Sequence, residues 1–377
     1  MSPSAASARR LPRARHEHLL GEIELRGAVR VATAASELGV NEVTIRRDII
    51  ALEKAGRLAR VHGGAISADT PTIPTAARAI VGLVLPGAGS HFPDVVRGAE
   101  ASPYGRRCRL IFASTKYRSS VEERQLERLV ELGAQGIIVA PSLRDRSIPD
   151  LVASLAEMPV PLVLIERDLE DSTPLARYDW VRTDQVRGTV LALEHLAALG
   201  HRRIGLALLD RTPAAPAIRE GYAQAAARLE LAPAPVRPLP KDEGEADDPT
   251  DRALRAFLEA CLDAGVRAAL VHTDFHASRL VEIALDLGVS VPEDFAVVAH
   301  DDEFAELAMV PLTAVSPPGR EIGRLAVDTL FERIRTEAPD RMPPRHIQLV
   351  PHLAVRASCG AHRQQSDDER PTSVTTG

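Results

Sequence analysis

The chain has 377 residues, of which 45% are hydrophobic and 26% are charged. This balance is typical of a globular protein, and the length exceeds that of one ordinary domain. The formal net charge of −6 does not favour nucleic acid as a partner. The charge is uneven, however: residues 1–65 carry 11 basic and 7 acidic residues, a net charge of +4, while the rest carries −10. A basic head on an acidic body is compatible with a modular DNA-binding protein.

Cysteine spacing and the N-terminal segment predict an intracellular protein. Cys108, Cys261 and Cys359 lie far apart without a CxxC pair, which excludes a disulfide framework and a cysteine zinc site and favours free thiols. Arg9 and Arg10 are not followed by the apolar run of a secretory signal. Since no segment is apolar enough to span a bilayer, we expect a cytoplasmic protein without a membrane partner.

The N-terminal residues predict three short helices. Residues 15–25 place Leu19, Leu20 and Ile23 on one face, and residues 31–38 form a second amphipathic segment. A turn at residues 39–41 precedes a third helix over residues 42–55.

In the third helix, Asn41 is suited to the N-cap and Gly56 to the C-cap. Ile45, Ile49 and Leu52 recur at helical spacing and are expected in the core. This spacing turns Thr44, Arg46 and Arg47 outward, as in the recognition helix of a helix-turn-helix. A solvated arginine pair is the alternative interpretation.

The motifs at residues 44–48 (TIRRD) and 60–65 (RVHGGA) decide between these interpretations. Together they closely resemble the DNA-binding domain of the DeoR family of repressors. The resemblance implies a winged helix-turn-helix over residues 15–66, with residues 57–65 forming a hairpin wing. We therefore expect double-stranded operator DNA as a partner. The candidate DNA-contacting residues are Asn41, Thr44, Arg46, Arg47, Arg60 and His62.

After a linker over residues 67–79, short apolar runs alternate with helix-length segments. The runs span residues 80–85, 110–113, 136–140, 161–165, 204–209, 268–272 and 295–299, and the clearest helical segments span 122–132, 187–199 and 277–287. Continuous apolar runs are typical of parallel strands that are buried on both faces. The length of this region predicts two α/β lobes, with ligand-binding residues after the strands. Residues 232–250 are expected to form a solvated loop.

Motifs at residues 161–167 (PLVLIER), 195–204 (HLAALGHRRI) and 297–302 (VVAHDD) resemble the sugar-sensing domains of the LacI family and the periplasmic binding proteins. The resemblance implies a periplasmic-binding-protein-like domain over residues 80–360, with two Rossmann-like lobes that close on a sugar-like effector. It places an aromatic wall at Phe92, beside His91, and polar contacts at Arg167, Arg219, Asp274 and Asp301. For Phe92 a plain core position is the alternative, for Arg167 a surface ion pair, and for Asp184 and Asp274 a helix cap.

Several positions depart from the family pattern. His91 replaces one of two aromatic residues, Pro317 stands where a glutamine is frequent, and Ile218 replaces an arginine, with Arg219 one place later. Such changes alter which ligand is accepted more than lost methylene groups do. The linker, with Pro71 and Pro74, lacks the apolar period of the hinge helix that usually joins such sensors to DNA-binding heads.

The sequence thus predicts a transcriptional regulator, and specifically a repressor, that is controlled by a small polar effector. Two-fold DNA reading implies a homodimer or a higher homo-oligomer. Residues 1–14 and 361–377 are expected to be flexible and disordered, respectively. No cofactor, metal or catalytic residue is predicted, because catalytic motifs such as HExxH, GxSxG and Walker A are absent. A metal site at His272 and His300, or a solute-binding protein without gene control, are the alternatives.

Overall fold

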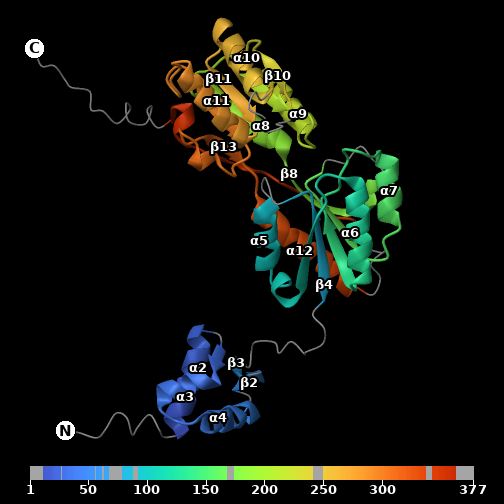
Figure 1. Ribbon diagram of the computed structural model, residues 1–377, viewed down its shortest axis with the longest axis vertical. Coiled ribbons are helices and arrows are strands. Elements are labelled where there is room, and N and C mark those ends of the chain that lie inside the picture. Colours follow the sequence, from blue (N-terminus) through green and yellow to red (C-terminus); the bar gives the residue numbers. More distant parts are fainter. Residues whose placement is uncertain are drawn as a thin grey trace, which may run out of the picture. The chain divides into compact units, whose positions relative to one another are not determined.

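The computed structural model describes residues 12–26, 28–55, 57–61, 63–67, 79–87, 92–167, 174–240, 249–336 and 342–361. The chain divides into two compact units, Met1–Ala77 and Arg78–Gly377 (Figure 1). We call the first unit the head and the second the two-lobed domain. The predictions for His62, His91 and the Gly56 cap lie outside the described residues, as do residues 1–11, most of the linker and residues 362–377.

The head consists of three helices and a small antiparallel sheet. Its helices are α2 (Pro12–Arg26), α3 (Val31–Leu38) and α4 (Glu42–Lys54), and its strands are β1 (Ala28–Arg30), β2 (Leu58–Val61) and β3 (Gly64–Ser67). The strand order is β1-β3-β2. Of the predicted inward positions, Leu20 is partly buried against the core of the head, and the others are buried: Leu19, Ile23, Ile45, Ile49 and Leu52. The winged helix-turn-helix architecture is therefore confirmed; α2 begins earlier than predicted, and β1 was not predicted.

A buried ion pair joins the first helix of the head to the third. Arg15 donates from Nε to Asp48 Oδ2 at 2.6 Å and from Nη2 to Asp48 Oδ1 at 2.9 Å. His16 Nε2 lies 3.3 Å from the same carboxylate. Asp48, the last residue of the TIRRD motif, thus fixes the recognition helix on α2 instead of facing outward.

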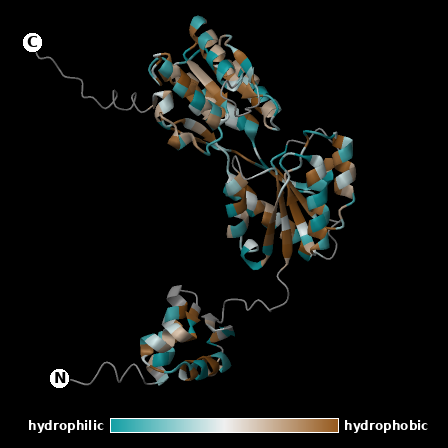
Figure 2. Cartoon of the chain, in the orientation of Figure 1, coloured by the Kyte–Doolittle hydropathy of each residue, from teal (hydrophilic) through white to brown (hydrophobic). Residues whose placement is uncertain are grey.

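The first lobe of the two-lobed domain contains a six-stranded parallel sheet in the order β14-β8-β7-β6-β4-β5. Its strands are β4 (Ile80–Leu85), β5 (Arg109–Ser114), β6 (Ala134–Val139), β7 (Leu162–Ile165), β8 (Asp179–Thr183) and β14 (His346–Leu349). Its helices are α5 (Phe92–Ala101), α6 (Ser119–Glu131), α7 (Ile148–Ala156) and α12 (Gly319–Arg335). Side chains of α5 and α12 pack on one face of the sheet, and those of α6 and α7 pack on the other. Burial on both faces explains the uninterrupted apolar strands (Figure 2).

The second lobe has a sheet in the order β10-β9-β11-β12-β13-β15, in which only β15 is antiparallel to its neighbour. Its strands are β9 (Gly205–Leu209), β10 (Val236–Leu239), β11 (Ala268–His272), β12 (Ala296–His300), β13 (Thr313–Ser316) and β15 (His352–Ala354). Its helices are α8 (Gln185–Ala198), α9 (Ala215–Arg228), α10 (Pro249–Asp263) and α11 (Asp274–Asp286). Again two helices cover each face, which confirms the predicted pair of α/β lobes.

Three chain segments connect the lobes. The first leads from β8 into α8, the second from β13 into α12, and the third from β14 into β15. These three crossings form the hinge between the two lobes. Because the third crossing returns from the C-terminal region, β14 pairs with β8 and β15 pairs with β13, strands that are distant in sequence.

The prediction of a solvated loop over residues 232–250 is wrong in part. Residues Val236–Leu239 form β10, which pairs in parallel with β9, and α10 begins at Pro249. Residues 241–248 lie outside the described residues. The strand was missed because it is short, largely exposed and contains Pro238, a residue that only an edge strand tolerates.

Candidate functional site

The start of the recognition helix α4 is held by side-chain hydrogen bonds. Asn41 Oδ1 accepts from the backbone N–H of Thr44 at 2.8 Å and from Thr44 Oγ1 at 2.7 Å. This geometry confirms Asn41 as the N-cap. Gly39, in the left-handed region at φ 63°, makes the turn from α3 into α4.

The basic side chains predicted to contact DNA are exposed on the head. Arg46 and Arg47 project from α4 into solvent, and Arg46 pairs with Glu42 at 3.0 Å along the helix. Arg60 is exposed on β2, with its Nε 3.7 Å from Glu53 Oε2. Exposed ion pairs of this kind are weak, so these arginines can exchange their carboxylate partners for phosphates or base edges.

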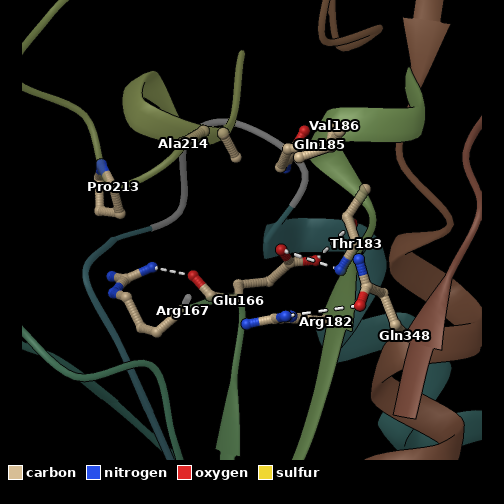
Figure 3. A pocket seen from close by; sticks show the side chains of 10 residues that line it. Glu166, Arg167, Arg182, Thr183, Gln185, Val186, Pro213, Ala214 and Gln348 are labelled. Carbon is tan, nitrogen blue, oxygen red and sulfur yellow. Dashed lines mark hydrogen bonds between the residues drawn. The ribbon is translucent and has the colours of Figure 1, made fainter. Parts of the chain in front are cut away.

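A pocket in the two-lobed domain is lined by both lobes at the β8–α8 crossing (Figure 3). The first lobe, including β14, contributes polar side chains. The second lobe contributes small apolar side chains and the amide of Gln185. The lining residues are Glu166, Arg167, Arg182, Thr183, Gln185, Val186, Pro213, Ala214, Ala217 and Gln348. The pocket therefore lies at the carboxyl end of β7 and β8, where ligands of open parallel sheets bind.

Arg167 is the pocket residue whose position the sequence predicted. It is 6% exposed, its Nε donates to the carbonyl of Pro141 at 2.5 Å, and its Nη1 donates to the carbonyl of Glu166 at 2.6 Å. Its buried Nη2 has no hydrogen-bond partner among the described residues. Burial lowers the pKa of Arg167, while nearby acidic groups oppose this shift. The alternative considered from the sequence was a surface ion pair of Arg167. The hydrogen bonds of Arg167 go to buried carbonyl groups instead.

Glu166, which sequence reasoning did not single out, lies beside Arg167. Thr183 donates from Oγ1 to Glu166 Oε1 at 2.8 Å, so this carboxylate bridges the ends of β7 and β8. Glu166 adopts φ 53°, an uncommon conformation for a residue other than glycine. Glu166 directly follows a buried strand, and this position could have identified it as a candidate ligand contact. The prediction named the adjacent Arg167 instead.

Asp301 ends β12 of the second lobe and is 8% exposed, at φ 79°. Its charge raises the pKa of Tyr117 in the first lobe, whereas the charge of Arg167 lowers it; burial is the largest cause of the net rise. Asp301 and Arg167 therefore act on the same phenol from opposite lobes. Asp301 is not among the residues that line the pocket, so its common site with Arg167 stays a prediction.

Three other predicted ligand residues have different surroundings. Phe92 is 4% exposed and packs in the core of the first lobe, which favours its alternative role as a core residue. Arg219 forms a close ion pair with Asp210 and does not line the pocket. Arg219 was predicted to bind ligand because it stands one place after the position of the family's arginine. That position in α9 is occupied by Ile218, which is buried.

Asp274 holds the loop that follows β12. Its carboxylate accepts backbone N–H groups of Phe275 at 2.9 Å, Glu303 at 2.7 Å and Phe304 at 2.5 Å. These bonds favour a structural role, and the N-cap of α11 is Thr273 instead. Asp184 does cap α8, accepting from the N–H of Arg187 at 2.8 Å.

The possible metal site at the strand ends lacks a third ligand. His272 and His300 are paired across β11 and β12, as expected. Within the described ranges, three metal-ligating side chains come together at His18, Glu22 and Glu37 in the head and not at this histidine pair. Among the described helices, none is both long and apolar enough to cross a membrane.

These features define a class of protein: a winged helix-turn-helix head joined to a two-lobed binding domain with a pocket between the lobes. Comparisons with known proteins agree. Residues 15–71 match the DeoR-like helix-turn-helix domain, and residues 193–359 match the periplasmic binding protein-like domain.

A full-length relative makes the assignment specific. The arabinose metabolism transcriptional repressor of Geobacillus stearothermophilus is 30% identical over 332 residues, which cover 86% of this chain and 89% of the relative. Two solved structures share the fold. A LacI family transcriptional regulator from Enterococcus faecium with bound ribose has 24% identity and a TM-score of 0.59, covering 74% of this chain and 98% of its own. A complex of the transcriptional regulator CelR with cellobiose has 23% identity and a TM-score of 0.61, covering 88% and 99%.

The chain belongs to the same family as this arabinose repressor, a family of transcriptional regulators, and its head matches the DeoR-like helix-turn-helix domain. It is thus a DNA-binding regulator rather than an enzyme.

Proposed function

We propose that the chain is a homodimeric, cytoplasmic repressor whose affinity for operator DNA is controlled by an uncharged sugar bound between the two lobes. The observation that carries the proposal is the pocket at the β8–α8 crossing, whose lining includes both Arg167, with its unpartnered Nη2, and Glu166. A guanidinium and a carboxylate can each hold two adjacent hydroxyl groups in a fixed geometry.

The pocket lining offers both donors and acceptors to the hydroxyl groups of a polyol. Arg167 and Arg182 supply guanidinium N–H groups, and Glu166, Thr183 and Gln348 supply oxygen acceptors. The names of similar proteins also support this ligand class: one relative is a repressor of arabinose metabolism, and two structural neighbours contain ribose and cellobiose. We propose Arg167 and Glu166 as effector-contacting residues of the first lobe and Asp301 as a further contact from the second lobe.

The DNA partner is proposed to bind the exposed face of α4 and the wing. Arg46 and Arg47 would enter the major groove near the start of α4, while Arg60 and His62 would contact the backbone. Asn41 and Thr44 hold the helix start in place for this contact. Two heads are needed to read a two-fold site, which is the reason to propose a dimer.

The proposal is tested by fluorescence anisotropy with duplex DNA from upstream of the gene, with and without L-arabinose, D-ribose or cellobiose. The wild-type protein should bind DNA in a salt-sensitive manner, and at least one sugar should change the affinity by about 5- to 150-fold. Arg47→Ala should weaken DNA binding about 10- to 100-fold and leave the sugar-induced thermal shift unchanged. Arg167→Met should abolish the sugar-induced thermal shift and leave the affinity for DNA without sugar unchanged.

Arg124→Ala, at an exposed position on α6, is the control for loss of positive charge and should change neither response. Salt-insensitive DNA binding by the wild-type protein would contradict the DNA-binding part of the proposal. A sugar response that survives in Arg167→Met would contradict the assigned cleft.

A further inference from the structure

A buried carboxylate lies beneath the first lobe's side of the cleft. Glu122, in the first turn of α6, is 0% exposed, and burial raises its pKa despite the opposing contact with Arg146. Its Oε2 accepts the backbone N–H of Ser142 at 2.7 Å, and its Oε1 accepts from Arg146 Nη2. A charge without solvent access is costly unless it is paired and hydrogen-bonded, as this one is.

The partners of Glu122 fix the segment that follows β6. Arg146 donates from Nε to the carbonyl of Ser142 at 2.8 Å, and the Ser142 hydroxyl lies 3.3 Å from that of Thr115. Ser142 is therefore held through its N–H, its carbonyl and its side chain. Both Ser142 and Thr115 are buried. The backbone at Ser142 has little freedom to move while Glu122 is present.

This fixed backbone is the support of the cleft arginine. Pro141, which directly precedes Ser142, provides the carbonyl that accepts from Arg167 Nε at 2.5 Å. The Glu122 carboxylate also raises the pKa of Arg167, against the larger lowering effect of burial. Glu122 thus acts on Arg167 in two ways, by geometry through Ser142 and Pro141 and by charge.

We propose that Glu122 is a positioning residue for Arg167: it fixes the Pro141 carbonyl and supplies a buried countercharge, so that Nη2 of the guanidinium points at the effector. Glu122 itself does not line the pocket. The proposal rests on the proposed function only in so far as Arg167 contacts the effector; the positioning of the guanidinium can be measured without any sugar.

The test uses ¹H–¹⁵N spectra of the arginine Nε–H groups in the full-length protein. The resonance of Arg167 is assigned by its absence in Arg167→Lys. Glu122→Gln, which keeps shape but removes the charge, should shift this resonance and increase its exchange with water, because the Pro141 carbonyl is no longer fixed. Titration with L-arabinose, D-ribose and cellobiose should then show an affinity at least about tenfold weaker than wild type for whichever sugar binds.

Asp179→Asn is the matched control. Asp179 is a buried carboxylate of the same lobe, paired with Arg333 at 2.7 Å and 2.8 Å, but not part of the segment that supports Arg167. This variant should lower stability without shifting the Arg167 resonance. If Glu122→Gln does not fold, Arg146→Lys removes the guanidinium contacts to the Glu122 carboxylate and the Ser142 carbonyl and should produce the same shift.

An unmoved Arg167 resonance in the folded Glu122 or Arg146 variant would overturn the proposal. An equal shift in Asp179→Asn would also overturn it, because it would show a general loosening of the lobe. If the resonance shifts as expected but none of the sugars binds the wild-type protein, the positioning role stands and the proposed sugar class fails.

Discussion

The imidazole of His272 is among the most enclosed titratable groups of the chain. It lies at the carboxyl end of β11 and is 3% exposed, and its ring is nearly perpendicular to that of His300 in a T-shaped contact with a centroid distance of 5.6 Å. Burial lowers its pKa to about 3, with smaller contributions from the neighbouring histidines and an opposing one from Asp301. His272 is therefore neutral near pH 7.

This lowered pKa predicts how stability depends on pH. Between about pH 6.5 and 3 the unfolded chain binds a proton at His272 that the folded chain does not, so the free energy of unfolding falls as the pH falls. One such proton corresponds to about 1.4 kcal/mol per pH unit. Urea unfolding between pH 6.5 and 5 should therefore show a loss about 2 kcal/mol smaller in His272→Asn than in wild type.

His352→Asn, at an exposed histidine of β15, is the control and should keep the pH dependence of the wild type. Equal pH dependence in wild type and His272→Asn would show that the buried imidazole does take up a proton.

Among the elements, α5 and α12 are packed unusually closely. The helices meet at glycines: a Cβ at Gly323 would lie 1.9 Å from the carbonyl oxygen of Val95, and one at Gly98 would lie 1.9 Å from that of Arg320. The obstructing atoms are backbone atoms, which cannot rotate away. These two glycines therefore allow α12, which follows the second crossing, to pack directly on α5 of the first lobe.

Replacing Gly323 by alanine should separate these helices. We expect the melting temperature of the two-lobed domain to fall, with a destabilisation of about 1–3 kcal/mol, since the cost of overpacking outweighs the better helix propensity of alanine. Differential scanning calorimetry measures it. Gly21→Ala in α2 is the opposite control: no atom lies within 4 Å of its Cβ, so this change should stabilise the head by up to about 1 kcal/mol. A stabilised Gly323→Ala protein would contradict the close packing.

At the scale of the whole molecule, we propose that an exposed apolar patch on the second lobe forms the dimer interface. Large apolar side chains gather where α11 begins and the loop after β12 passes: Phe275 is 48% exposed, Phe304 49%, Leu307 82% and Met309 71%. The backbone N–H groups of Phe275 and Phe304 share the Asp274 carboxylate, which holds these two residues near each other. An exposed apolar patch of this kind marks an interface, and a second copy is the occupant that a two-fold DNA site requires.

Leu307→Glu should therefore weaken the dimer. Burying a carboxylate at the centre of the interface is costly, and we expect analytical ultracentrifugation to show monomer at concentrations where the wild type is dimeric. DNA affinity should fall as well, because one head alone contacts half of the site. Leu132→Glu, at an exposed leucine of the first lobe, should change neither property. A Leu307→Glu protein that remains dimeric would place the interface elsewhere.

Local patterns in the sequence were sufficient for the architecture. Ile45, Ile49 and Leu52 repeat at helical spacing and are buried. The apolar strands are buried by helices on both faces of their sheet, and these helices lie between the strands in the sequence. These patterns act over a few residues, because one helix turn or one strand already determines which side chains must leave water. The head, the two lobes and the position of Arg167 at a strand end could therefore be predicted.

Which residues line the cleft depends on contacts between segments that are distant in the sequence. Strands β14 and β15 return from the C-terminal region to pair with β8 and β13, and no local pattern encodes those partners. The same holds for the buried pairs Arg15–Asp48 and Glu122–Arg146. Both Arg167 and Arg219 were predicted from the family resemblance, yet Arg167 lines the pocket and Arg219 pairs with Asp210. Which polar groups meet is decided by how helices and strands pack, since packing alone determines which charges must be satisfied inside the protein.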